Sequence, residues 1–165
     1  MVLDLEARLE VGGDHQDLIN RRMAENYLSD AKSIFTEAKA ARRRKLHHRA
    51  IRLSQESFEL SVKAILRLVG VEYPKEHEVS DAMRDSATKF PHWFQSLVAD
   101  FEEASVWLSE RRAPAMYGDE VAGKPASQLF NNRDSRKALT FAGEALRSCE
   151  RLLKEAIGKS HLRRA

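Results

Sequence analysis

The segment RRAPAMYGDE, residues 111–120, places two arginines, a tyrosine and two acids where a long helical pattern ends. A guanidinium group binds phosphate oxygens through paired, charge-assisted hydrogen bonds, so Arg111 and Arg112 are candidate contacts to a phosphate. Tyr117 and Asp119 follow closely and are candidate members of the same site. The segment therefore concentrates polar chemistry at the end of a helix.

A structural role is the alternative for the same segment. The two arginines would then pair with Asp119 and Glu120 to fasten the helix end, and Tyr117 would pack beneath them. Gly118 would supply a positive φ for the turn, a conformation that glycine adopts without steric cost. The sequence leaves both roles open.

The densest basic run, RRRKLHHR at residues 42–49, is a second candidate for contact with phosphates. Its alternative is a solvated corner between two helices, because Lys and Arg often collect at helix C-termini, where they complement the helix dipole. Whether the Arg42 to Arg49 run binds anything is left open by the sequence.

Motifs for cofactors and metals are missing. The sequence contains no GxGxxG, P-loop, HExxH, GxSxG or paired CxxC motif, so most classes of cofactor-binding and hydrolytic site have no anchor. His47 and His48 are sequence neighbours with no carboxylate at ligand spacing beside them, which does not favour a metal site. We expect no cofactor and no metal.

Length and composition predict one domain over residues 1–165, with a core over about 14–157 and short flexible ends. The chain is 42% hydrophobic and 32% charged, with a formal net charge of +3, which is typical of a soluble globular protein. The single cysteine, Cys149, excludes an internal disulfide and lies in an apolar helical stripe, as a core thiol does. No apolar run approaches the ~20 residues that span a bilayer, so we expect a cytoplasmic protein without membrane contact.

Apolar residues recur at helical spacing throughout and predict an all-α fold. Residues 46–69 are apolar over more than half of the helix circumference, which predicts a helix in the middle of a bundle or at a dimer seam. Glu59 and Lys63 on its polar stripe have the spacing of an i, i+4 ion pair. The other expected helices begin near Asp14 or Asp17, cover 78–89, run from Pro91 to the arginine pair with Pro114 as the stop, and begin again at Asn132 or Asp134.

Three segments together resemble a HEPN domain (higher eukaryotes and prokaryotes nucleotide-binding). They are QESFELSVKAILRLVG at 55–70, PKEHEVSDAM at 74–83, and RRAPAMYGDE before the last helix. The resemblance covers residues from about 20 to 157 and depends on the order and spacing of the segments. It implies an antiparallel bundle of four or five helices that forms a homodimer, with a cleft between the two copies.

Many HEPN proteins are metal-independent ribonucleases, often toxins paired with a small nucleotidyltransferase-like (MNT) antitoxin. Their active motif is an arginine followed, after four to six residues, by a histidine shortly before the last helix. Arg112 matches the arginine, but Tyr117 stands where the histidine is expected. An imidazole with an ordinary pKa near ~6.5 exchanges protons at neutral pH, whereas a tyrosine hydroxyl near ~10 is a poor base. The departure favours binding over cutting.

Arg43 and His48 repeat the spacing of this motif at another place, between the first two expected helices. A run so rich in arginine and histidine produces such a spacing by chance. We therefore do not expect this pair to form the family's active site.

The sequence thus predicts a dimeric, non-catalytic HEPN-like protein that binds a nucleotide or RNA phosphate in a cleft with Arg111, Arg112, Tyr117 and Asp119. The alternative is a divergent, metal-independent endoribonuclease of a HEPN/MNT toxin–antitoxin pair, with Arg112 at the phosphate. In a third interpretation the bundle holds a nucleotidyltransferase partner, and Tyr117 accepts a nucleotidyl group from it.

Overall fold

The computed structural model describes residues 3–73, 75 and 78–164 of the chain. Within these residues the backbone forms α-helices and two short 3₁₀ helices, and no strand. In chain order they are α1 (Leu3–Arg43), α2 (His47–Leu68), α3 (Ser80–Asp85), η1 (Ala87–Lys89), α4 (His92–Gln95), α5 (Val98–Tyr117), η2 (Ala126–Gln128) and α6 (Asn132–Arg164). The all-α fold class predicted from the sequence is confirmed.

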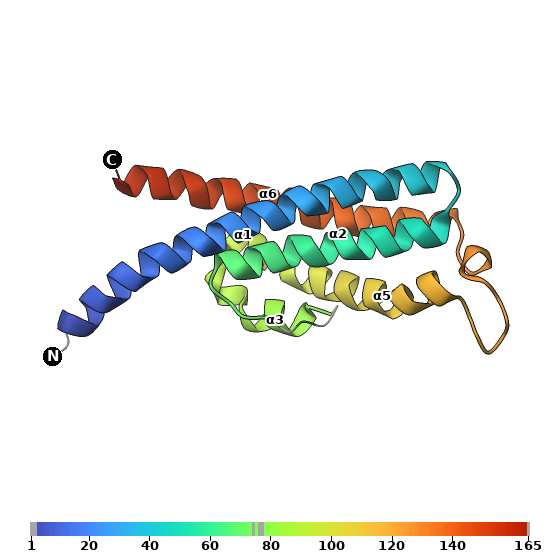
Figure 1. Cartoon of the computed structure of the whole chain (residues 1–165), viewed down its shortest axis with the longest axis horizontal. Helices are drawn as coiled ribbons and strands as arrows, with labels where there is room; N and C mark the ends of the chain where they lie inside the picture. Colours follow the sequence, from blue (N-terminus) through green and yellow to red (C-terminus); the bar gives the residue numbers. More distant parts are fainter. Residues whose placement is uncertain (1–2, 74, 76–77, 165) are drawn as a thin grey trace.

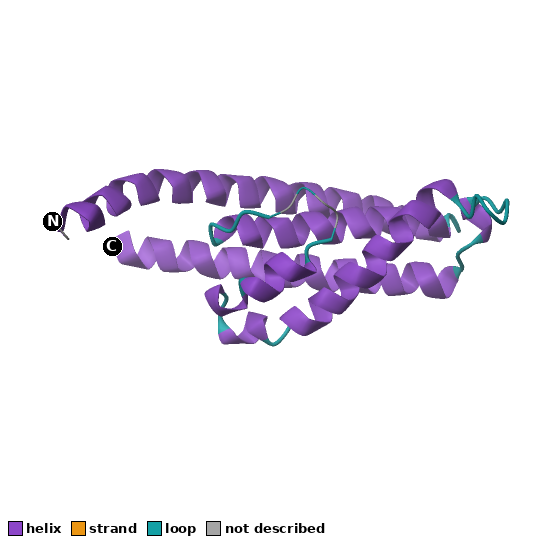
Figure 2. Ribbon diagram, turned by 90° about the horizontal axis from the view of Figure 1, so that it is seen from below, coloured by secondary structure: helices purple, strands orange, loops and turns teal. Residues whose placement is uncertain are grey.

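The helix α2 lies in the middle of the bundle. It packs against α1, α5 and α6, while α3 packs on α5. Figures 1 and 2 show α1, α2 and α6 side by side along the long axis, with α5 against α2. Ile51, Val62 and Ile65 of α2 are fully buried, and Ser57 Oγ donates a hydrogen bond to the Ala31 carbonyl of α1 at 2.7 Å. The wide apolar arc in the sequence correctly predicted this central position.

The first helix begins earlier than expected. We predicted a start near Asp14 or Asp17, but α1 already begins at Leu3. The preceding residues LDLEARLEV include several strong helix formers, and Gly12 and Gly13 lower the helix propensity without ending the helix. The two aspartates lie in the helix interior and do not cap it.

The helix expected from Pro91 to the arginine pair is divided in two. Pro91 directly precedes α4. The helix divides between α4 and α5, where the Leu97 N–H bonds to the carbonyl of Phe94, three residues back, at 2.9 Å. Such i to i−3 bonds form the tighter 3₁₀ turn in which helices often end. In the same way, the expected helix over 78–89 is interrupted at Ser86, between α3 and η1.

Pro114 does not end α5, contrary to the prediction. A proline removes one backbone N–H donor from a helix, but its carbonyl still accepts, and here the Gly118 N–H bonds to it at 2.9 Å. The helix therefore continues to Tyr117. It ends at Gly118, whose φ of 78° and ψ of −162° lie in a region that is essentially restricted to glycine.

The loop after α5 is held at both of its ends. Asp119 and Lys124 exchange two backbone hydrogen bonds at 2.9 and 3.0 Å. Asn131 Oδ1 accepts from the backbone N–H groups of Arg133 and Asp134, and Asp134 Oδ2 accepts from the Asn131 N–H. This reciprocal arrangement is a capping box. The cap of α6 is therefore Asn131, which lies one residue before Asn132 and three before Asp134, the two predicted candidates.

Cys149 is fully buried in α6, as predicted for a core thiol, and burial raises its pKa. Cys149 belongs to the same hydrophobic core as Phe58, Phe94 and Phe101. The Phe101 ring meets those of Phe58 and Phe94 edge to face. In the part of the chain that the structure describes, no helix has a stretch long and apolar enough to cross a membrane.

Candidate functional site

Arg111 lies flat against an aromatic ring of its own helix. Its guanidinium carbon is 3.9 Å from the centre of the Trp107 ring, and its Nη1 donates to the Trp107 carbonyl at 2.9 Å. Lys137 of α6 approaches the same ring to 5.0 Å. Arg111 is therefore held on the α5–α6 surface by cation–π contacts.

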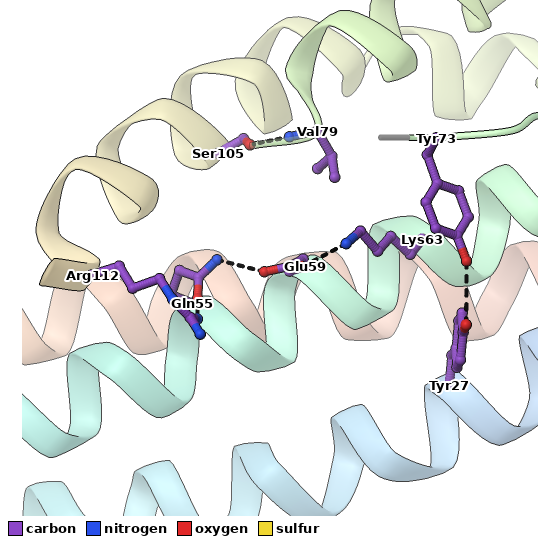
Figure 3. A network of polar contacts seen from close by, with 8 residues as sticks. All are labelled: Tyr27, Gln55, Glu59, Lys63, Tyr73, Val79, Ser105 and Arg112. Carbon is purple, nitrogen blue, oxygen red and sulfur yellow. Dashed lines mark hydrogen bonds and ion pairs between the residues drawn. The ribbon is translucent and has the colours of Figure 1, made fainter. Parts of the chain in front are cut away.

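Arg112, the next residue, points the other way. Its Nη1 donates to Oε1 of Gln55 on α2, as Figure 3 shows. Gln55 Nε2 donates to Glu59 Oε2 at 2.9 Å, and Lys63 Nζ donates to Glu59 Oε1 at 2.6 Å. We call these four residues the polar row, because three of them follow one another along α2 and Arg112 joins them from α5.

The polar row lies largely inside the bundle. Gln55 is 1% exposed, and the side chains of Lys63 and Glu59 are only 11% and 12% exposed. The i, i+4 pair predicted from the sequence is confirmed, but it is not the surface pair that the spacing alone suggests. Charges so removed from water require hydrogen-bonded partners of opposite sign, which gives the row a structural role.

Two tyrosines extend the polar row toward α1. Lys63 Nζ lies 5.4 Å from the centre of the Tyr73 ring, and the Tyr73 hydroxyl donates to that of Tyr27 at 3.3 Å (Figure 3). Burial and the hydrogen bond with Tyr27 raise the pKa of Tyr73. The contacts connect the segment after α2 to both α1 and the charged row.

A neighbouring contact fixes the start of α3 on α5. Glu78 Oε1 accepts from the Ser80 N–H at 2.6 Å and from the Ser105 hydroxyl at 2.8 Å. Burial opposes ionisation of Glu78, but the hydrogen bonds from Ser80 and Ser105 outweigh it and lower its pKa. The sequence did not predict that Glu78 and Ser80 would meet Ser105, because a serine in an amphipathic helix carries no distinctive signal.

Tyr117 and Asp119 lie apart from the two arginines. Tyr117 is 66% exposed and lines a surface pocket of about 420 Å³, which we call the α5-end pocket; its lining residues are Ala113, Pro114, Tyr117, Gly118, Asp119, Glu120 and Leu129. Asp119 Oδ1 accepts from the Ala122 N–H at 2.9 Å. The four predicted site residues are therefore divided among three surroundings.

These positions contradict the structural role that the sequence offered as the alternative for residues 111–120. Among the described residues, neither arginine pairs with Asp119 or Glu120, because one lies on Trp107 and the other turns toward Gln55. Tyr117 is exposed and does not pack beneath them. The predicted positive φ of Gly118 is confirmed; an added Cβ would lie 2.2 Å from the Lys124 carbonyl oxygen.

The basic run forms a pocket with the start of α6. The pocket, of about 310 Å³, is lined by Arg42, Arg43, Lys45, His47 and Asn132, and we call it the basic pocket. Two contacts with α6 hold its side chains: Arg42 Nη2 donates to Asn132 Oδ1 at 2.9 Å, and His47 Nδ1 lies 2.9 Å from Ser135 Oγ. The sequence did not predict that α6 contributes.

His48 does not line the basic pocket, so the structure does not gather Arg43 and His48 around it. Burial lowers the pKa of His48, and the nearby positive charges of Arg52, Arg49 and His47 lower it further. No group of three His, Cys, Asp or Glu side chains that could hold a metal ion was found among the described residues.

Both pockets belong to the same end of the bundle. There the turn between α1 and α2, the loop between α5 and α6, and the beginning of α6 come together (Figure 1). A family model described as "HEPN domain" matches residues 24–153, which include both pockets and the polar row. No curated protein and no solved structure matched the chain.

The polar row makes a prediction for stability. Glu59→Leu removes the Glu59 carboxylate from the largely buried Lys63 ammonium, and we expect a loss of about 3 kcal/mol in the free energy of unfolding. Adding Lys63→Met removes both charges and should recover much of that loss. Urea denaturation measures both variants. Glu25→Leu, which breaks the exposed Arg21–Glu25 pair, is the matched control and should cost less than about 1 kcal/mol.

The interpretation of the row as a buried charge network is contradicted if Glu59→Leu costs no more than Glu25→Leu. It is also contradicted if the double variant is destabilised by the sum of its two single changes.

Proposed function

Because the chain belongs to the HEPN family, we propose that it binds a phosphate group of a nucleotide or an RNA near the C-terminal end of α5 and does not cut it. One observation carries the proposal: the two motif positions have separate surroundings. Arg112 is anchored by Gln55 of α2, whereas Tyr117 stands exposed on the wall of the α5-end pocket, at the position of the motif histidine.

Arg112 suits a phosphate contact because its guanidinium is already held in place. A guanidinium has five N–H donors, and the bond to Gln55 uses one of them. Anchoring the side chain before the ligand arrives lowers the conformational entropy lost on binding. Arg111 is the weaker candidate, since its guanidinium already lies on the Trp107 ring.

Tyr117 suits binding better than proton transfer. A tyrosine hydroxyl is a poor general base at neutral pH, because its ordinary pKa lies near ~10. Its exposed ring offers a flat surface on which a nucleobase stacks, an interaction worth about 1–3 kcal/mol per base. Asp119 lines the same pocket and offers an acceptor for sugar or base hydroxyl and amino groups.

A homodimer with the site in its cleft is part of the proposal. Val106, Ala113 and Tyr117 are exposed on α5, and their spacing places them along one face of the helix. Met116 adds exposed apolar surface beside them. Two copies that pack along this face would cover it. They would also bring two α5 ends together, as a cleft between the two copies of a homodimer requires.

The binding proposal predicts the effect of a single substitution. We expect Arg112→Ala to weaken binding of a short single-stranded RNA by about tenfold or more, which corresponds to about 1.4 kcal/mol. Arg112→Lys should recover only part of the affinity, because lysine keeps the charge but lacks the planar fork. Fluorescence anisotropy with labelled RNA, and calorimetry with mononucleotides, provide the measurement.

Arg147→Ala, at an exposed position of α6, is the matched control and should bind as wild type. Urea denaturation establishes that each variant is folded. Wild-type affinity in folded Arg112→Ala would exclude Arg112 as the phosphate contact.

The exposed hydroxyl of Tyr117 favours a second candidate function, that of an acceptor for a nucleotidyltransferase partner. The Tyr117 oxygen would bond to the α-phosphorus of a nucleoside triphosphate supplied by the partner. The bond from that phosphorus to the bridging oxygen would break, pyrophosphate would leave, and the phenolic proton would pass to a base of the partner or to water.

Intact-mass measurement tests this second candidate. After incubation with an MNT-type partner and ATP, wild type should gain the mass of one or more adenylyl groups, and Tyr117→Phe should gain none. Tyr73→Phe, in which the altered hydroxyl is bonded to Tyr27 inside the structure, is the control and should be modified like wild type. An equal gain in Tyr117→Phe excludes Tyr117 as the acceptor.

A further inference from the structure

The turn between α1 and α2 has an unusual residue at its centre. The Leu46 N–H bonds to the Ala41 carbonyl and the Lys45 N–H bonds to the Arg42 carbonyl, both at 2.9 Å. This pair of bonds is a Schellman motif, in which the residue at the position of Lys45 is usually glycine. Lys45 has a φ of 61° and is the only non-glycine residue with positive φ among those described.

A lysine in this conformation is strained, because its Cβ approaches the backbone in a way that glycine avoids. Backbone strain that a sequence retains is often associated with a functional site. Lys45 lines the basic pocket, so the strained residue contributes an ammonium group where three other cationic or titratable side chains also lie.

The basic pocket has the electrostatics of a site for an anion. Its lining includes Arg42, Arg43, Lys45 and His47 and no acidic residue. The first turn of α2 also contains no acid, and no side chain caps its N-terminus, so the positive end of that helix adds to the field of the side chains. The positive charge is therefore not neutralised by the residues that line the pocket.

Two of the side chains that line the pocket are held in fixed positions. Arg42 is bonded to Asn132, and the His47 ring lies against Ser135. The Nε atom of Arg42 is buried and makes no hydrogen bond within the described structure. A volume of about 310 Å³ is at the small end of the range for ligand pockets, which suits a phosphate group better than a whole nucleotide.

We propose that the basic pocket binds a backbone phosphate of a single-stranded RNA, with Arg42, Lys45 and His47 as its contacts. Its lining contains no Phe, Tyr or Trp ring and is dominated by cationic side chains, which favours the phosphate as the part that it recognises. Its lining residues come from the turn between α1 and α2 and the start of α6, which lie at the same end of the bundle as the loop after α5 (Figure 1), and a single strand carries a phosphate at every nucleotide. The inference rests on the proposed function for the nature of the ligand, but it uses different residues.

Lys45→Gly separates binding from folding. Glycine relieves the strain, so the variant should unfold at a higher urea concentration than wild type. It should nevertheless bind single-stranded RNA more weakly, and the slope of log K against log salt should become shallower by about 0.7, the value for one lost phosphate contact. Lys154→Gln, at an exposed position of α6, removes the same charge and should leave the salt slope unchanged.

The two proposals fail separately. If Lys45→Gly keeps wild-type affinity and salt slope, the basic pocket does not contact RNA and the inference is overturned. If Lys45→Gly weakens binding and Arg112→Ala does not, the inference holds and the proposed site at α5 fails. Competition by ATP that Lys45→Gly abolishes would identify a free polyphosphate as the ligand and overturn the assignment to RNA.

If no RNA binds to wild type, a titration with inorganic phosphate decides whether the pocket is an anion site. Chemical-shift changes confined to the amides of Lys45, His47 and Asn132 would show that the basic pocket binds phosphate, and the assignment of RNA as its ligand would be wrong. If these amides do not change, the basic pocket is not an anion site and the inference is overturned.

Discussion

The contact between Arg112 of α5 and the polar groups along α2 is the interaction on which the site depends. Gln55, Glu59 and Lys63 are largely buried where α2 meets its neighbours, and a polar group inside a protein is costly unless it is hydrogen-bonded. Because Arg112 donates to Gln55, the bond favours the rotation of α5 about its own axis that brings these two side chains together. The rotation in turn directs Tyr117 outward and determines where the following loop begins.

This constraint bears on the proposed function, in which the chain binds a phosphate group without cutting it. In the family's motif an arginine and a histidine act together on one phosphodiester, whereas here the arginine is anchored to a row of structural contacts and a tyrosine occupies the histidine's position. The chemistry that remains consists of an oriented cation, an exposed aromatic ring and, at the same end of the bundle, a pocket lined by basic side chains. Such a set favours attraction and positioning of phosphates, and a tyrosine at the motif position is a poor acceptor for the 2′-hydroxyl proton.

Much of the fold could be predicted from the sequence, because helical periodicity reports which faces are buried. The central position of α2, the core thiol of Cys149 and the positive φ of Gly118 all follow from local patterns. The partners of the site residues do not. Arg112 and Gln55 are 57 residues apart, and Arg42 and Asn132 are 90 apart, so only the packing of the helices reveals these contacts. Pro114 misled the prediction because a proline removes only one N–H donor from a helix, and its carbonyl still accepts from the Gly118 N–H.

The most direct test of the central claim is an RNA-cleavage assay in EDTA, with mixed tRNA and mRNA as substrates, comparing purified wild type and Arg112→Ala. The account predicts that both proteins leave the RNA intact, over a protein concentration range in which wild type binds it. Fragments produced by wild type and absent with Arg112→Ala would contradict the account, because the end of α5 would then be a working nuclease site in spite of its tyrosine.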